Sequence, residues 1–402
     1  MPVYLDHAAT TPVRPRALSL FTEQAALGGN PSSLHAAGQR ARRALEDARE
    51  SLAGLLGAHP SELIFTSGGT EADNLAVKGL FWARREANPR RHRILCSTVE
   101  HHAVLDTVEW LERHEGAEVV WLPCDAEGVT SVEAVRSELE RDADSIALVA
   151  VMWANNEVGA VQPVEEIAAL AAEHGIPVHS DAVQAFGHVP LDFAASGLAT
   201  MAVSGHKLGA PVGVGALVVR RDVVVTPVQH GGGQQRGLRS GTLDAAAAAA
   251  FAAAAGDAVA SLPDEAVRLG SLRDQLVEGV VREVPGARLS GPSDPARRLP
   301  GIAHFTFPGC EGDSLLFLLD MMGVEASTGS ACTAGVPRPS HVLLAMGLTE
   351  EQARGAQRLS LGWTTTQGDV DEFLAVVGRA YEQARKAGMA GRESSIRTAS
   401  SR

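Results

Sequence analysis

Residues 145–181, SIALVAVMWANNEVGAVQPVEEIAALAAEHGIPVHSD, predict a strand, a helix and a second strand in that order. The apolar runs at 145–152 and 176–181 have the length of buried strands. Between them, residues 164–175 place Ile167 and Ala171 at helical spacing and end on a glycine, which is typical of a helix C-terminus. A strand, a helix and a strand in sequence predict two parallel strands joined by a crossover helix.

The same alternation of strand-like and helix-like segments extends over residues 60–220. It predicts an α/β fold with a mainly parallel sheet that is covered by helices. In such a sheet, ligands bind beyond the carboxyl ends of the strands, so polar residues at those ends are the candidate site residues. The other strand-like stretches are ELIFTS (62–67), HRILCST (92–98), AEVVWLP (117–123) and GALVVRR (215–221).

The pattern changes in the second half of the chain, where a long polar helix is expected at 263–284. Shorter strand-like pieces follow at 301–307 (GIAHFTF) and 357–362 (QRLSLG), and together these segments predict a smaller α+β domain. We expect four parts: an N-terminal segment that packs with the small domain (1–15), a large cofactor-binding domain (16–257), the small C-terminal domain (258–388) and a mobile polar tail (389–402).

Composition indicates a globular protein, because 45% of the 402 residues are hydrophobic and 21% are charged. The net charge of −13 argues against direct nucleic-acid binding. The N-terminus has no signal-peptide pattern, and the alanine-rich run 245–255 is too short to span a membrane, so we expect a buried helix there and no membrane contact. Four scattered cysteines without a C-x-x-C pair are typical of a reducing cytoplasm.

Small residues follow the strand at 62–67, where Gly68, Gly69 and Thr70 precede a helical pattern. A helix start of this kind leaves backbone N–H groups free for a phosphate, although an ordinary N-cap has the same sequence. Two histidines, His101 and His102, follow the strand at 92–98. They suit a structural role, or a flat ring against a cofactor, better than a metal, because no further ligand lies at the right spacing.

The next two strand ends carry amides and a carboxylate. Asn155 and Asn156 follow the strand at 145–152, where a turn is the simplest interpretation. Asp181 ends a buried strand and needs a cationic or hydrogen-bonded partner, with Gln184 one turn later. Lys207 precedes the strand at 215–221 and is either a solvated charge or a covalent anchor. Lysine, carboxylate, amides, histidine and an anion site together are what pyridoxal 5'-phosphate requires.

Nine segments in their expected order make the chain resemble the cysteine desulfurases of the class V aminotransferase family, and the likeness runs from residue 4 to about 362. The resemblance implies a homodimeric pyridoxal-phosphate enzyme of fold type I, the aspartate-aminotransferase-like fold. The segments are YLDHAATTP (4–12), GNPSSLH (29–35), FTSGGTEADN (65–74), EHHAV (100–104), NNEVGAVQP (155–163), HSDAVQAFG (179–187), SGHKLGAPVGVG (204–215), RSGTLD (239–244) and STGSACTAG (327–335).

The resemblance also implies a role for each matching residue. Lys207 would form a Schiff base with the cofactor, His101 would stack on its ring and assist proton transfers, and Asp181 would pair with the ring nitrogen. Arg358 would clamp the carboxylate of the L-cysteine substrate through bidentate hydrogen bonds, with Asn30 close by. The remaining cofactor contacts would be Asn156 and Gln184 near the phenolate oxygen, and Gly69, Thr70, Ser204, His206 and the partner subunit's Thr242 at the phosphate.

Cys332 is the expected nucleophile, because its Gly, Ser, Ala and Thr neighbours suit an accessible loop, whereas Cys96 lies in an apolar strand. The longer loop resembles group I, the NifS/IscS-like branch. That branch implies transfer of the persulfide to an iron–sulfur scaffold or a tRNA thiolase. No catalytic metal is expected, and the one metal contact that the resemblance implies is a cluster that Cys332 would ligate while the cluster is in transit. A selenocysteine lyase, other enzymes of the same fold and a non-catalytic binding protein remain the alternatives.

Overall fold

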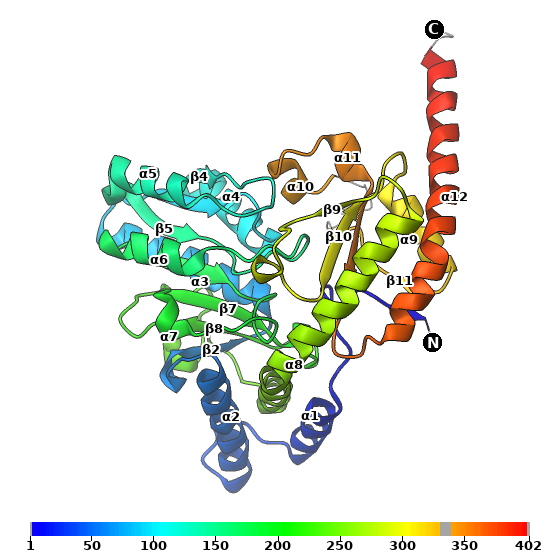
Figure 1. The fold of residues 1–402 in the computed structure, drawn as a ribbon. Helices are drawn as coiled ribbons and strands as arrows, with labels where there is room; N and C mark the ends of the chain where they lie inside the picture. The colour runs from blue at the N-terminus through cyan, green and yellow to red at the C-terminus, as the bar shows by residue number, and fades with distance from the viewer. Residues whose placement is uncertain (1, 330–338, 400–402) are drawn as a thin grey trace.

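The computed structural model describes residues 2–329 and 339–399, with side chains as far as residue 386 (Figure 1). A seven-stranded and a three-stranded sheet are joined along one side by the long helix α8, which extends from beside the larger sheet to beside the smaller one. Cys332 lies outside the described residues.

The larger sheet has seven strands in the order β2-β8-β7-β6-β5-β3-β4. All neighbouring pairs from β4 across to β7 are parallel, and β8 pairs antiparallel with both β7 and β2. The α/β fold with a mainly parallel sheet is therefore confirmed. The strands are β2 (Leu63–Thr66), β3 (Arg93–Ser97), β4 (Glu118–Leu122), β5 (Ile146–Ala150), β6 (Val178–Asp181), β7 (Thr200–Ser204) and β8 (Gly215–Val219).

Helices cover both faces of this sheet, and alternation along β5 shows how. Val149 packs into one cluster with Ile167 of α6, whereas Leu148 packs into another with Leu75 of α3 and Val104 of α4. Successive strand residues face opposite sides, so an entirely apolar strand needs a helical layer on each face. The helices are α3 (Gly69–Ala87), α4 (His102–Glu115), α5 (Val132–Asp142), α6 (Val164–Glu173) and α7 (Phe193–Ser196).

The helix α8 (Ala245–Glu283) corrects one expectation, because the alanine-rich run and the polar helix form a single element. Pro263 lies within it without ending it. The alanines of its first half are buried against α1 (Pro15–Leu27) and α2 (Ala36–Leu55), since small side chains allow close helix approach. By length and composition α8 could cross a membrane, but half of its most apolar window is buried within the protein, as in a core helix.

The smaller sheet is antiparallel, in the order β12-β10-β9, with a parallel pair of β1 and β11 beside it. Val3 and Leu5 of the N-terminal segment share its hydrophobic cluster with the second half of α8. The expected boundary at residue 258 falls inside α8 and stays a prediction. The strands are β1 (Val3–Tyr4), β9 (Arg288–Ser290), β10 (Ile302–Thr306), β11 (Val324–Glu325) and β12 (Ala356–Ser360).

The last helices lie around this sheet: α9 (Gly312–Met321), α10 (His341–Ala345), α11 (Glu350–Arg354) and α12 (Gln367–Ala399). The helix α12 projects beyond the rest of the protein (Figure 1) and continues through residues 389–399, where we expect a polar tail. Single turns of 3-10 helix complete the description: η1 (Pro60–Glu62), η2 (Ala143–Ser145), η3 (Gly205–Lys207), η4 (Gln235–Gly237) and η5 (Pro295–Arg297).

The strand β7 is absent from the sequence-based strand predictions, yet it positions the site. It lies between β6 and β8 in the sheet and ends at Ser204. The end of β6, at Asp181, pairs with Ala202 of β7. Lys207 follows three residues after the end of β7, in η3. The parallel pairing of β6 with β7 therefore brings the carboxylate and the lysine to the same edge of the sheet.

Candidate active site

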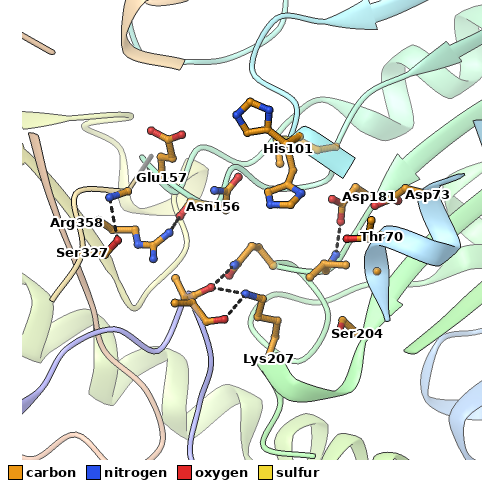
Figure 2. Close-up of a pocket in the computed structure, with 18 of the residues that line it drawn as sticks. Thr70, Asp73, His101, Asn156, Glu157, Asp181, Ser204, Lys207, Ser327 and Arg358 are labelled. Atoms are coloured by element: carbon orange, nitrogen blue, oxygen red, sulfur yellow. Dashed lines mark hydrogen bonds between the residues drawn. The ribbon is translucent and has the colours of Figure 1, made fainter. Parts of the chain in front are cut away.

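A cavity of about 390 Å³ lies at the carboxyl ends of the large sheet and reaches the small sheet (Figure 2). In Figure 2, His101 and Lys207 lie on opposite sides of a space that has Arg358 at one end and Asp181 at the other. Ten of the sequence-predicted site residues line this cavity: Gly69, Thr70, His101, Asn156, Asp181, Gln184, Ser204, His206, Lys207 and Arg358.

Lys207 projects into the cavity from η3. Its Nζ donates hydrogen bonds of 2.6 Å to the backbone carbonyls of Ala8 and Ala9. Burial and, to a smaller extent, the charge of Arg358 lower the pKa of Lys207 to about 8, and the opposing charge of Asp181 limits this lowering. An amine with this pKa is partly neutral near physiological pH, so it can act as a nucleophile and as a base.

Asp181 occupies the end of β6 opposite Arg358. Its Oδ1 accepts a 2.8 Å hydrogen bond from the backbone N–H of Val183. Burial raises the pKa of Asp181 to about 6, a rise that this hydrogen bond and the charge of Lys207 partly offset. A buried carboxylate of this kind is stabilised by any cationic group that enters the cavity beside it.

A second buried carboxyl, Asp73 of α3, also lines the cavity and was missed by sequence reasoning. Its Oδ1 lies 3.1 Å from His179 Nε2, and His179 Nδ1 lies 3.0 Å from Thr200 Oγ1. Burial lowers the pKa of His179 to about 3, so the ring is neutral. Burial, followed by the charge of Asp181, raises the pKa of Asp73 well above its usual value. The sequence signal that could have identified Asp73 is its place one turn into a predicted helix, on a face that is otherwise apolar, since a buried carboxyl there needs a partner.

The start of α3 forms an anion pocket with the end of β7. A Cβ at Gly69 would lie 2.7 Å from Val183 Cγ2 and 3.8 Å from Ser204 Cβ, so the space there admits only glycine without rearrangement. Ser204 Oγ is buried and has no hydrogen-bond partner among the described residues. Thr70 is exposed on the first turn of the helix. Free N–H groups, hydroxyls and the helix dipole together suit a phosphate.

His206 lies beside this pocket, with Nδ1 3.3 Å from Thr10 Oγ1. Burial and the neighbouring Lys207 charge lower the pKa of His206 to about 4, so its ring is neutral at physiological pH. A neutral imidazole can donate one hydrogen bond to a phosphate oxygen without adding a charge.

His101 is the N-cap of α4. Its Nδ1 accepts a 3.1 Å hydrogen bond from the backbone N–H of Ala103. Desolvation of the ring and the charge of Lys207 lower the pKa of His101 to about 4. Because Nδ1 accepts, the proton of the neutral ring resides on Nε2. The cap thereby fixes both the tautomer and the orientation of the ring at the cavity.

The small sheet contributes Arg358 from β12. Its Nη1 donates to the backbone carbonyl of Asn156 at 3.0 Å, and its Nη2 donates to Asp6 Oδ1 at 2.8 Å. Gln184 Nε2 donates to the carbonyl of Ala8 at 2.8 Å. Arg358 and Gln184 therefore connect residues 6–8 to both sheets across the cavity.

Three predicted site residues are not placed in this cavity. Asn30 is exposed between α1 and α2, and Thr242 is exposed just before α8; neither lines it. Cys332 lies outside the described residues, but Gly329 and His341, on either side of segment 330–338, both line the cavity.

The three described cysteines are poor nucleophiles. Cys96 is buried in β3, as expected, and burial raises its pKa well above the usual value. Burial likewise raises the pKa of Cys310 to about 12 and that of the half-buried Cys124 above its usual value. Within the described residues, no group of three His, Cys, Asp or Glu side chains is arranged to hold a metal ion.

Comparison with known proteins shows the family of the chain. Residues 3–373 match the family model described as Aminotransferase class-V. The chain is 57% identical over 387 residues to an IscS-like cysteine desulfurase of Mycobacterium tuberculosis, a match that covers 96% of this chain and 98% of that protein.

Two solved structures share the fold. A NifS-like protein superposes with a TM-score of 0.85 at 35% identity, covering 94% of this chain and 99% of its own. SspA, solved in complex with cysteine, superposes with a TM-score of 0.76 at 35% identity, and the match covers 89% of this chain and 98% of the SspA chain.

The fold and the cavity define a class V aminotransferase-type enzyme, a family of pyridoxal-phosphate-dependent proteins. Within it, the chain belongs to the cysteine desulfurases of the IscS/NifS type. The resemblance of the nine sequence segments is thus confirmed. These relatives favour a cysteine desulfurase over the two alternatives, a selenocysteine lyase and a non-catalytic binding protein.

Proposed function

We propose that this desulfurase binds pyridoxal 5'-phosphate through Lys207 and converts L-cysteine to L-alanine, leaving a persulfide on Cys332. The observation that carries the proposal is the position of Lys207, an amine with a pKa of about 8, between Arg358 and Asp181 in one cavity. This arrangement, with Asp181 at one end and Arg358 at the other (Figure 2), suits a ligand with a basic ring nitrogen at one end and a carboxylate-bearing substrate at the other.

The residues present fit this cofactor. Gly69, Thr70 and the unpartnered hydroxyl of Ser204 would hold the phosphate, with His206 beside them. Asp181 would neutralise the protonated ring nitrogen, since burial raises its pKa to about 6 despite the charge of Lys207, and a cationic partner beside it would stabilise the carboxylate. The remaining contacts would be His101 against the ring, Asn156 and Gln184 near the phenolate oxygen, and the partner subunit's Thr242 at the phosphate.

When bound, pyridoxal phosphate supplies the electron sink for bond changes at the substrate α-carbon. Arg358 holds the substrate carboxylate through the guanidinium N–H groups that Asp6 and Asn156 leave free. Lys207 takes up and delivers the α-proton, because its lowered pKa suits proton transfer near neutral pH. His101 carries a proton on Nε2 and assists these transfers. Asn30 would lie near the substrate carboxylate in the assembled enzyme.

Cys332 attacks the sulfur of the substrate as a thiolate. A sulfur–sulfur bond forms as the carbon–sulfur bond breaks, and the electron pair of the broken bond stays with the substrate carbon. Protonation of that carbon gives alanine. SspA, a structural relative, was solved with cysteine, which supports cysteine as the substrate here.

The enzyme is proposed to work as a cytoplasmic homodimer that passes sulfur to an acceptor protein, either an iron–sulfur scaffold or a tRNA thiolase. Sharing of Thr242 across the dimer would make each site depend on its partner. A net charge of −13 favours protein acceptors over direct contact with nucleic acid.

The roles of the two reactive residues are separable by mutation. Lys207→Ala should lose the absorbance of the bound cofactor together with turnover. Cys332→Ala should keep that absorbance but form no persulfide, whereas Cys124→Ala, which changes a half-buried cysteine outside the cavity lining, should retain activity. Sustained sulfide and alanine release by Cys332→Ala would contradict the assigned nucleophile.

A further inference from the structure

Asp6 is the charged neighbour of the substrate clamp that the proposed mechanism does not use. Its Oδ1 accepts a hydrogen bond of 2.8 Å from Arg358 Nη2. The Arg358 side chain is 5% exposed and that of Asp6 21% exposed, so the ion pair is largely shielded from water. A shielded pair of this kind is stronger than a surface salt bridge.

Arg358 is held in place without Asp6. Its backbone N–H donates to the Ser327 carbonyl at 2.6 Å, and β12 pairs it with His304 of β10. Its Nη1 is fixed separately by the carbonyl of Asn156 at 3.0 Å. Because β12 fixes the backbone of Arg358 and the Asn156 carbonyl holds its Nη1, the distinctive contribution of Asp6 is its negative charge.

That charge acts on two cations of the cavity. Arg358 lowers the pKa of Lys207, whereas Asp6 and Asp181 raise it, so Asp6 acts on both positive groups. A guanidinium that is already paired with one carboxylate attracts a second carboxylate less strongly than an unpaired guanidinium does.

The chemistry of the reaction gives this weakening a purpose. Substrate cysteine and product alanine carry the same carboxylate, so the clamp binds both equally. Binding energy that is equal for substrate and product does not accelerate the chemical step, and an overly tight clamp would retain alanine. We propose that Asp6 is an affinity-determining residue: it keeps the affinity of Arg358 for the carboxylate of substrate and product low, so that alanine is released. This inference rests on the proposed role of Arg358 as the carboxylate clamp.

The test compares carboxylate and non-carboxylate ligands on the cofactor-loaded enzyme. Asp6→Asn removes the charge with little change in shape, and we expect the dissociation constant of L-alanine, measured by calorimetry, to fall about fivefold. The KM for L-cysteine should fall in parallel. Affinity for cysteamine, which has the same amine and thiol but no carboxylate, should stay unchanged.

Tyr4→Phe is the matched control. The Tyr4 hydroxyl donates to the carbonyls of Asp6 at 3.2 Å and Thr10 at 2.8 Å, so its removal loosens the same segment without altering charge. Alanine affinity should then match the wild type. If Asp6→Asn does not fold, Asp6→Ser removes the same charge and replaces it in the comparison.

Unchanged or weaker alanine binding in the charge-removed variant would overturn the role of Asp6, as would an equal gain in Tyr4→Phe. Arg358→Gln separates this inference from the proposed function. Unweakened alanine binding in Arg358→Gln would refute the clamp itself. Weakened binding there, with no gain in Asp6→Asn, would refute only the affinity-determining role.

Discussion

The lowered pKa of Lys207 makes capture of pyridoxal phosphate by the apoprotein depend on pH in a defined way. Only the neutral amine can attack an aldehyde. With a pKa of about 8, about one Lys207 in ten is neutral at pH 7. An ordinary lysine, with a pKa of about 10.5, would be neutral about once in three thousand molecules, so burial and Arg358 increase the reactive fraction about 300-fold.

The expected profile follows from that equilibrium. The capture rate should rise about tenfold between pH 6 and 7, rise more slowly to pH 8, and level off above it. Three groups near Lys207, namely His101, His206 and Asp181, titrate below pH 7 and leave this profile in place. His101 and His206 have pKa values of about 4, and Asp181 has a pKa of about 6.

Stopped-flow absorbance on mixing apoprotein with pyridoxal phosphate measures this rate directly. Nα-acetyl-lysine under the same conditions corrects for ionisation of the cofactor itself. A rate that keeps rising tenfold per pH unit through pH 9 and 10 would show an unperturbed lysine and refute the account of how the cavity activates Lys207.

Three further substitutions test other parts of the site. Gly69→Ala places a methyl group 2.7 Å from Val183 Cγ2 in the anion pocket, so the dissociation constant of pyridoxal phosphate, measured by fluorescence titration, should rise at least about tenfold. Asp73 has a raised pKa in the folded state, so the folded apoprotein loses stability as the pH rises above about 4, the usual pKa of an aspartate. Asp73→Asn should flatten this pH dependence of the melting temperature between pH 5 and 8, and a steeper dependence would contradict the raised pKa of Asp73. Ser340→Ala removes two contacts: the 2.5 Å hydrogen bond to the buried Glu157 carboxylate and the N-cap hydrogen bond of α10. The free energy of unfolding in urea should therefore fall by about 2 kcal/mol, and an unchanged value would exclude a structural role for these contacts.

Much of the site could be predicted from local sequence because of how parallel sheets are built. Asp181 and Lys207 follow strands whose carboxyl ends share one edge, so polar residues after successive strands converge there. Gly69 and Thr70 start a helix after β2 and reach the same edge. For Asp181, Gly69 and Thr70, recognising the preceding strand was sufficient to locate the side chain. The strand before Lys207, β7, was not predicted, and Lys207 was identified by its position before β8 and by the family resemblance.

The remaining features depend on pairings between distant segments that local patterns do not encode. The contact of Asp6 with Arg358 joins residues that are 352 positions apart in the sequence, because the segment that follows β1 lies beside β12. The pair of Asp73 and His179 requires α3 to pack across β6. Periodicity identifies each element, but it does not specify which buried polar groups will face one another.

The extent of α8 was missed for a different reason. The expected polar helix begins at Pro263, and proline is common in the first turn of a helix but disfavoured within one. Packing of the alanine-rich half against α1 and α2, and of the second half against the small sheet, outweighs that local preference. Tertiary packing commonly overrides intrinsic propensity in this way.

The attachment site of the cofactor tests the central claim most directly. The chain contains three lysines, Lys78, Lys207 and Lys386, and Lys78 lies outside the cavity with its Nζ 4.6 Å from the centre of the Trp110 ring. Purified protein loaded with pyridoxal phosphate should be reduced with borohydride, digested and examined by mass spectrometry. A single phosphopyridoxyl group on Lys207 is the predicted result. A label on Lys78 or Lys386, or none on Lys207, would contradict the assignment of this cavity as the catalytic site.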